Sequence, residues 1–213
     1  MAHDTASRRQ REVLRLYTEA LASFGRRVHL VAANQWTAPT PCSAWSVYDL
    51  VHHLTVRQLW VPELLMGATA AEVGDRLGGG PPDGGRAEHP AAAWTAAAEA
   101  AREAFAVPGA FDLTVHPRHG DRSALDYCTE LILDATVHTW DLARATGGDA
   151  HLAPELVEFA LHEATRQLSR PGAADRYAPA VESPATADPQ TRLLALLGRR
   201  VGACSEVDPE FTW

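Results

Sequence analysis

Apolar residues recur at intervals of three and four along four long segments of the chain, and this spacing restricts the fold more than any other feature. It is the period of an α-helix that buries one face. In the second segment Ser46, followed three residues later by Asp49, is a helix start signal, and Gly147 with Gly148 closes the fourth. The pattern predicts an all-α fold. The four segments cover about residues 6–34, 46–67, 90–106 and 123–146.

The rest of the chain adds shorter elements to these four. Helical patterns near residues 154–169 and 189–198 predict short C-terminal helices, and a brief alternation near 111–121 allows a small β element. The Gly/Pro-rich stretch 78–85 predicts a surface loop. With 213 residues the chain is long enough for one domain with a full core. We therefore expect a single domain over residues 1–213, an antiparallel four-helix bundle with C-terminal helical additions.

Charge and cysteine content exclude several classes of protein. All 19 basic side chains are Arg, and 27 acidic residues give a formal charge of −8, so no positive surface for nucleic acid is expected. Cys42, Cys128 and Cys204 are odd in number and form no C-x-x-C pair, which favours a reducing compartment. No apolar run of membrane-spanning or signal-peptide length is present. The sequence predicts a cytoplasmic protein that acts on a small molecule, away from membranes, and leaves a homodimer open.

Asp134 and His138 are the most informative polar residues of the fourth segment. At about 100° per residue they lie on the same stripe as the apolar residues Tyr127, Leu131 and Leu142. A buried carboxylate needs a cation, a set of hydrogen-bond donors or a metal as its partner. The i, i+4 spacing brings both side chains within reach of one ion. A simple hydrogen bond between the two residues in the core is the alternative, and spacing alone leaves both open.

The second segment offers a further candidate ligand. His52 and His53 are adjacent, point about 100° apart and flank the apolar face on opposite sides. Periodicity cannot choose between them. A histidine from this helix would complete a His, Asp, His triad with an open coordination position, the arrangement that distinguishes a catalytic zinc site from a structural one.

Three stretches of the sequence resemble the signatures of a known family. Residues 39–54 (PTPCSAWSVYDLVHHL), 137–147 (VHTWDLARATG) and 187–199 (ADPQTRLLALLGR) match them in order, over nearly the whole chain. The sequence resembles the DinB-like superfamily. It is most similar to the actinobacterial metal-binding branch related to the N-terminal domain of mycothiol-dependent maleylpyruvate isomerase.

The resemblance implies a four-helix bundle that holds one divalent metal, with Zn²⁺ as the expected ion. The histidine before Leu in the first signature matches His53, and the histidine of the second signature matches His138. The isomerase has Glu four residues before that second histidine, where this chain has the shorter Asp134. Glu130, one turn earlier, is the alternative carboxylate.

The resemblance also shapes the functional prediction. The isomerase carries a further small domain after its bundle, whereas this sequence ends at Trp213, so we expect the bundle to act alone and on a substrate other than maleylpyruvate. We predict a metal-dependent transferase or isomerase that uses a low-molecular-weight thiol, with mycothiol as the candidate co-substrate, on a small electrophilic metabolite. The alternatives are a hydrolase that uses metal-bound water and a non-catalytic metal or small-ligand binding protein.

Several other residues are secondary candidates. Asp141, three residues after His138, could orient its imidazole or pair with Arg144 on the surface, and the sequence leaves both open. Cys42 has no basic neighbour in the sequence, which favours a buried, unreactive side chain. Three residues are candidates for substrate binding, against the commoner alternative of solvated side chains. They are Arg57, one turn after His53, and His116 and His119 in a proline-bearing loop.

Overall fold

The structure is a computed structural model, and it divides into two compact units. Unit 1 comprises residues 1–30 and 51–132, and unit 2 comprises residues 31–50 and 133–213. The prediction of one domain stays a prediction. The structure describes residues 2–42, 44–77, 89–169, 178–184 and 186–201.

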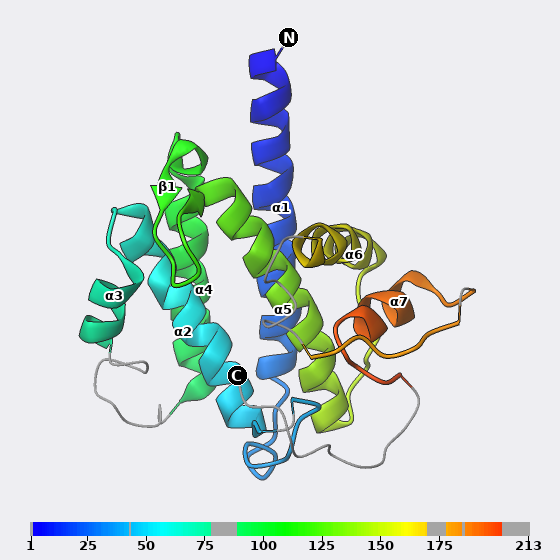
Figure 1. The fold of residues 1–213 in the computed structure, drawn as a ribbon. Coiled ribbons are helices and arrows are strands. Elements are labelled where there is room, and N and C mark those ends of the chain that lie inside the picture. The colour runs from blue at the N-terminus through cyan, green and yellow to red at the C-terminus, as the bar shows by residue number, and fades with distance from the viewer. Residues whose placement is uncertain (1, 43, 78–88, 170–177, 185, 202–213) are drawn as a thin grey trace. The chain divides into compact units, whose positions relative to one another are not determined.

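Helices dominate the described residues, which confirms the predicted all-α class. Four long helices follow the four predicted segments, and three shorter ones, α3, α6 and α7, join them (Figure 1). None of the described helices is long and apolar enough to cross a membrane. The α-helices are α1 (Ala2–Val28), α2 (Val47–Leu65), α3 (Ala70–Leu77), α4 (Pro90–Ala106), α5 (Ala124–Thr146), α6 (Pro154–Leu168) and α7 (Pro189–Leu196).

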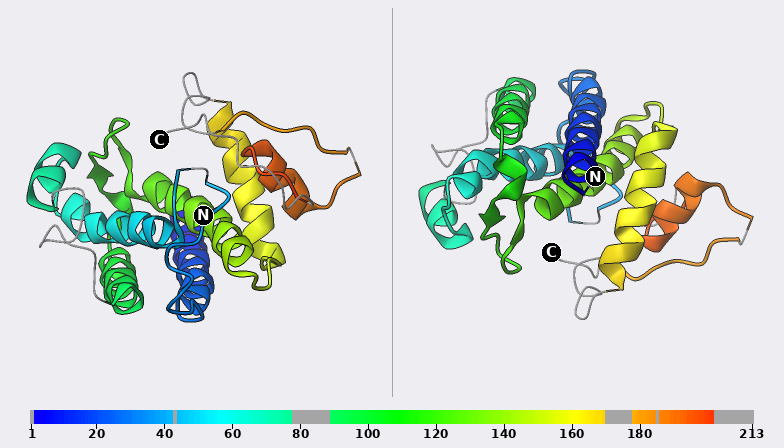
Figure 2. Two further views of the ribbon diagram at one scale, coloured as in Figure 1. Left: turned by 90° about the horizontal axis from the view of Figure 1, so that it is seen from below. Right: turned by 90° about the horizontal axis from the view of Figure 1, so that it is seen from above.

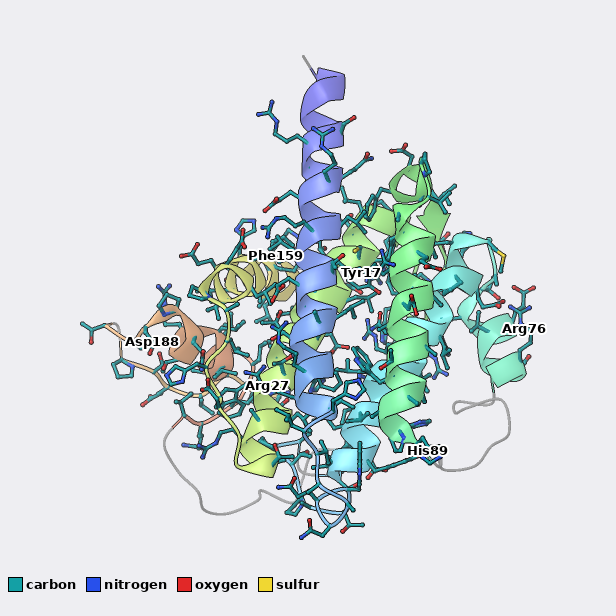
Figure 3. The ribbon with its side chains drawn as sticks, turned by 180° about the vertical axis from the view of Figure 1, so that it is seen from behind. Tyr17, Arg27, Arg76, His89, Phe159 and Asp188 are labelled. Atoms are coloured by element: carbon teal, nitrogen blue, oxygen red, sulfur yellow. The ribbon has the colours of Figure 1, made fainter. Side chains whose placement is uncertain are left out.

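In unit 1, α1 and α4 pack side by side through aromatic side chains. Tyr17 points from α1 toward α4 (Figure 3), where its ring meets Phe105 edge-on at 5.2 Å between centroids. Two turns along the pair, Phe24 meets Trp94 at 4.7 Å. Gly25 makes this approach possible, because a Cβ there would lie 2.8 Å from the indole nitrogen of Trp94. The two helices are therefore held together by two edge-to-face aromatic contacts.

A small β element confirms the one expected near residues 111–121. After the short 3-10 helix Ala110–Asp112, β1 (Thr114–Val115) pairs antiparallel with β2 (Arg122–Ser123). The main chain of His116 also bridges to Thr69, just before α3, so the hairpin is attached to that helix. The predicted loop at 78–85 lies outside the described residues.

The observed helices differ from the predicted ones in two respects, the end of the first helix and the presence of an additional short helix. The helix α1 ends at Val28, not near residue 34, and Leu30 beyond it is 80 % exposed, so no buried face continues there. The helix α3 was not predicted. Thr69 and Glu72 form its start, each side chain accepting a hydrogen bond from the other residue's main-chain N–H, as Ser46 and Asp49 do for α2.

In unit 2, α6 and α7 pack against each other (Figure 2) and confirm the predicted C-terminal helices. Asp188 caps α7 by accepting a hydrogen bond from the main-chain N–H of Thr191. Gln190 joins this helix to the segment after α5 through Ala150 and Leu152. The buried core of this unit comprises Leu133, Val137, Trp140, Leu152, Val157, Ala160, Ala164, Leu193, Leu194 and Leu197.

Candidate functional site

His138 lies on α5 between two carboxylates of the same helix. Its Nδ1 lies 2.8 Å from Oδ2 of Asp141, and its Nε2 lies 3.3 Å from Oδ1 of Asp134. The spacings of three and four residues place all three side chains on one face of α5. The side chain of His138 is 10 % exposed. One ring therefore has its two nitrogens directed at two different acids.

Asp141 is fully buried, and its partner cation comes from beyond α7. The Nη2 of Arg199 donates to Oδ2 at 2.9 Å, and its Nε donates to Oδ1 at 3.3 Å. Burial by itself raises the pKa of Asp141, but the charge of Arg199 and the hydrogen bond from His138 outweigh it and hold that pKa well below its usual value. Asp141 is therefore a carboxylate at neutral pH.

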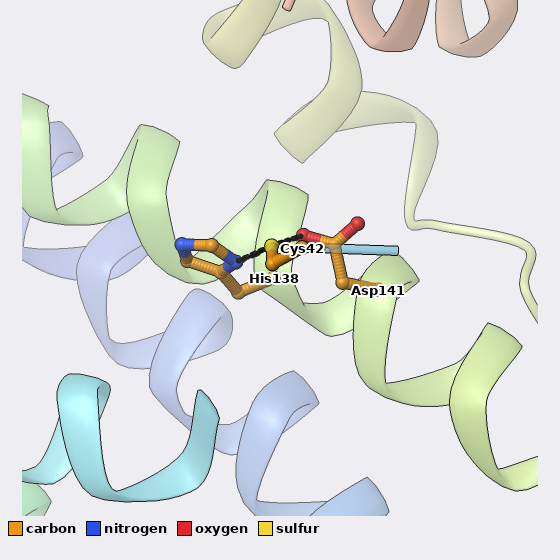
Figure 4. A group of neighbouring side chains, drawn as sticks. All are labelled: Cys42, His138 and Asp141. Carbon is orange, nitrogen blue, oxygen red and sulfur yellow. Dashed lines mark hydrogen bonds and ion pairs between the residues drawn. The ribbon is translucent and has the colours of Figure 1, made fainter. Parts of the chain in front are cut away.

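Cys42 completes the cluster from the loop before α2, as Figure 4 shows. Its thiol donates to Oδ2 of Asp141 at 3.4 Å, and its Sγ lies 3.9 Å from Nδ1 of His138. Nη2 of Arg199 lies 3.5 Å from the same sulfur. The side chain is buried, as expected, and although Cys42 has no basic neighbour in the sequence, the fold brings Arg199 to it from 157 positions away.

The pKa of His138 reflects both carboxylates. Burial lowers it, but hydrogen bonds with Asp134, Asp141 and Cys42 raise it well above its ordinary value. The two ring nitrogens nevertheless differ in their surroundings. Nδ1 faces the ion pair of Asp141 and Arg199, whereas Nε2 faces the carboxylate of Asp134.

Two sets of side chains around His138 carry metal-ligand atoms, and they fit a metal differently. Cys42, His138 and Asp141 bring three such atoms within 4.8 Å of one another. The guanidinium of Arg199, however, already occupies the cation position beside Asp141 and Cys42, so a divalent ion there would meet a positive charge. On the other side of the ring, Nε2 of His138 and Oδ1 of Asp134 form an N, O pair of the kind that zinc accepts.

The third predicted ligand belongs to the other unit. His53 lies on α2 and is partly exposed, as is His52. Its approach to Asp134 and His138 stays a prediction. Glu130, the alternative carboxylate, forms an ion pair with Arg122 of β2, and both side chains are largely buried. Glu130 thus anchors the hairpin to α5.

The three candidate substrate-binding residues all lie in unit 1. His116 follows β1 and His119 lies in the turn of the hairpin, and Nδ1 of His116 lies 2.8 Å from a carboxylate oxygen of Asp121. The carbonyl of His119 accepts a hydrogen bond from Arg122. Arg57 lies on α2 and is partly buried. Their role in binding a substrate stays a prediction.

Sequence reasoning missed two members of the cluster and one neighbour. Arg199 ends the third signature, and Cys42 and Trp45 lie in the first, so the signatures contained the signal. The ring of Trp45 lies 5.9 Å from that of His138. Of the two partners weighed for Asp141, the structure shows the hydrogen bond with His138, while Arg144 lies over the ring of Trp140.

Comparison with known proteins gives a family for this arrangement. Residues 17–143 match the family model described as the mycothiol maleylpyruvate isomerase N-terminal domain. Uncharacterized proteins from two strains of Mycobacterium tuberculosis, CDC 1551 / Oshkosh and H37Rv, are each 33 % identical to this chain over 191 residues. That alignment covers 88 % of this chain and 98 % of each relative. No solved structure matches.

Proposed function

Because the chain belongs to the mycothiol maleylpyruvate isomerase N-terminal domain family, a metal-binding family of the DinB-like type, we propose that it is a divalent-metal-dependent enzyme that uses a low-molecular-weight thiol. Mycothiol is the thiol that the family description favours. The observation that carries the proposal is the position of His138, whose Nδ1 is held by Asp141 while Nε2 faces the carboxylate of Asp134.

The proposed ligands are His53, Asp134 and His138, with Zn²⁺ as the ion. Two imidazoles and one carboxylate are a three-ligand set that leaves a fourth position open for a substrate. When bound, the metal would lower the pKa of a coordinated thiol, so that the thiolate is available at neutral pH.

The burial of the two acids indicates from which side a substrate would reach His138. The side chain of Asp141 is completely buried, whereas that of Asp134 is 20 % exposed. The Asp141 side of the imidazole is therefore closed, and access is from the side of Asp134. On the closed side, Asp141 holds the Nδ1 proton and so leaves Nε2 as the ligand atom.

The proposed substrate is a small electrophilic metabolite. The thiolate would add to one carbon of an electron-poor C=C bond, so that the C–S bond forms as the π bond breaks, and protonation of the other carbon would leave the thioether as the transfer product. If instead the adduct rotates about the resulting single bond before the thiolate is expelled and the C=C bond re-forms, the net result is cis–trans isomerisation with the thiol regenerated. Arg57 is the proposed anchor for a carboxylate of this substrate, and His116 and His119 are proposed as further substrate-binding residues. The proposal includes a cytoplasmic location, which the buried free thiols of Cys42 and Cys128 support.

Metal analysis tests the first half of the proposal. The purified protein should contain about one zinc or other divalent ion per chain, and His53→Ala together with His138→Ala should remove it. His52→Ala is the matched control, because it changes the adjacent histidine of the same helix. A wild-type protein that binds no metal, or a double variant that retains it, would contradict the proposal.

Thiol dependence tests the second half. The metal-loaded protein is incubated with a panel of small electrophiles, with and without mycothiol, and products are followed by mass spectrometry. Products that carry the thiol, or isomerisation that requires it, are the expected result. Turnover without any thiol would instead assign the site to hydrolysis by water.

A further inference from the structure

We propose that Arg199 is a positioning residue for the imidazole of His138, acting through the carboxylate of Asp141. The part of this inference that concerns metal binding rests on the proposed function. Arg199 lies 61 positions after His138 in the sequence and outside the residues that match the family model, which end at 143. The contact network is contained within unit 2.

The guanidinium of Arg199 is fixed on three sides. Nε and Nη2 donate to the two oxygens of Asp141, which sets the plane of that carboxylate. Nη1 donates to the main-chain carbonyl of Leu197 at 2.8 Å, and Nη2 also contacts the sulfur of Cys42. The side chain is only 11 % exposed. A group held in this way has a single orientation.

The end of α7 directs Arg199 to this position. Gly198 has a φ of +80°, and a Cβ there would lie 2.6 Å from the Cβ of Ala178, so only glycine fits without a shift. The main-chain N–H of Arg199 then donates to the carbonyl of Leu194 at 2.8 Å, which closes the helix. The turn therefore places the next side chain against α5.

Asp141 transmits the position of Arg199 to the imidazole. Oδ2 of Asp141 accepts hydrogen bonds from His138, Cys42 and Arg199, while Oδ1 accepts from Nε of Arg199. Because its two oxygens accept hydrogen bonds from two N–H groups of the planar guanidinium of Arg199, the carboxylate cannot rotate without losing at least one of these two hydrogen bonds. The ring of His138 is thereby kept in the orientation in which Nε2 faces Asp134.

Two variants and one control test the inference. Arg199→Gln removes the positive charge and the paired N–H donors of the guanidinium, whereas Arg199→Lys keeps the charge but loses the paired hydrogen bonds. Arg200→Gln is the matched control, because it removes the adjacent arginine, which is exposed. All four proteins, wild type included, are checked for helical content by circular dichroism. If Arg199→Gln does not fold, the measurements below are made on Arg199→Lys and compared with Arg200→Gln.

The first measurement is the Zn²⁺ dissociation constant, obtained by competition with a chelating dye. Removal of a residue that orients a metal-ligating histidine weakens metal binding by about 10- to 100-fold. We expect a loss of this size for Arg199→Gln, a smaller loss for Arg199→Lys and wild-type affinity for Arg200→Gln. Equal affinities in folded Arg199 and Arg200 variants would overturn the inference.

The second measurement needs no metal. The Nδ1–H proton of His138, hydrogen-bonded to a buried carboxylate, is followed as a downfield proton resonance in the metal-free protein, and its loss in His138→Ala assigns it. The resonance should disappear or shift in both Arg199 variants and persist in Arg200→Gln. Its persistence at the wild-type position in the Arg199 variants would overturn the positioning role. A wild-type protein that binds no Zn²⁺ would contradict the proposed function alone, and this resonance would still decide the role of Arg199.

Discussion

The guanidinium of Arg199 lies 2.9 Å from the carboxylate of Asp141, although the two residues are 58 positions apart in the sequence. The pair connects the segment after α7 to the C-terminal part of α5 within unit 2. Both charges are largely removed from water, and His138 lies directly against the acid. The stability of this unit and the orientation of the candidate metal ligand are therefore linked through one carboxylate.

Asp141→Asn should strongly destabilise the protein. It leaves the guanidinium of Arg199 buried without a counter-charge, and breaking one partner of a buried ion pair costs about 3–5 kcal/mol. Urea unfolding followed by circular dichroism measures the loss. The double variant Asp141→Asn with Arg199→Gln removes both charges and should recover part of it. A double variant less stable than the single one would contradict the buried pairing.

The contribution of Asp141 to stability should depend on pH. Its pKa is depressed in the folded protein, so its contribution is complete above the unfolded pKa of about 3.9 and is lost as the pH falls through and below that value. The difference in unfolding free energy between wild type and Asp141→Asn should therefore shrink by about 1 kcal/mol between pH 7 and pH 3. Urea titrations of both proteins at the two pH values measure this difference. A difference that is the same at pH 7 and pH 3 would refute the depressed pKa of Asp141 in the folded protein.

The buried cysteines should react slowly in the native protein. Cys42 is 9 % exposed and Cys128 is fully buried, and burial raises the pKa of the Cys128 thiol well above its ordinary value. In a Cys204→Ser background, Ellman's reagent should label neither thiol rapidly under native conditions and both after unfolding in guanidinium. Rapid native labelling of Cys42, identified by peptide mapping, would show that the cluster around His138 is open on that side.

Gly25→Ala should destabilise the packing of α1 against α4. The added methyl group would lie 2.8 Å from the indole nitrogen of Trp94, and overpacking of this kind costs about 1–3 kcal/mol, more than the helix propensity gained from alanine. Gly74→Ala in α3 is the control, because its Cβ would meet only the end of Arg118 at 3.7 Å. Thermal unfolding should show a lower midpoint for the first variant and an unchanged or higher one for the second.

The helical elements were predictable from the sequence because they depend on local signals. Periodicity and caps placed α4, α5, α6 and α7 within a few residues of their observed bounds. The helix α3 has the same kind of start signal, Thr69 with Glu72, but its eight residues are too few for a clear apolar period. The end of α1 was placed too late, near residue 34, although the buried face ends at Val28 and Leu30 lies in solvent.

The candidate site was predictable only where its residues share a helix. Asp134, His138 and Asp141 are separated by one turn each, so helical geometry alone places them together. Arg199 and Cys42 reach the same cluster through tertiary folding, and no local pattern relates them to His138. The choice between His138 and Arg144 as the partner of Asp141 also required the tertiary structure. It shows that Asp141 is buried, and this burial excludes an ion pair with Arg144 on the surface.

The position of Arg199 has a practical consequence for dissecting this protein. A fragment cut at residue 143, where the family match ends, would contain Asp141 but not the arginine that balances its charge. Exchanging such a fragment between relatives would place a buried acid opposite whatever residue the recipient carries there. Chimeras and truncations should therefore keep the chain intact through residue 200, so that the acid of α5 and the arginine after α7 are inherited together.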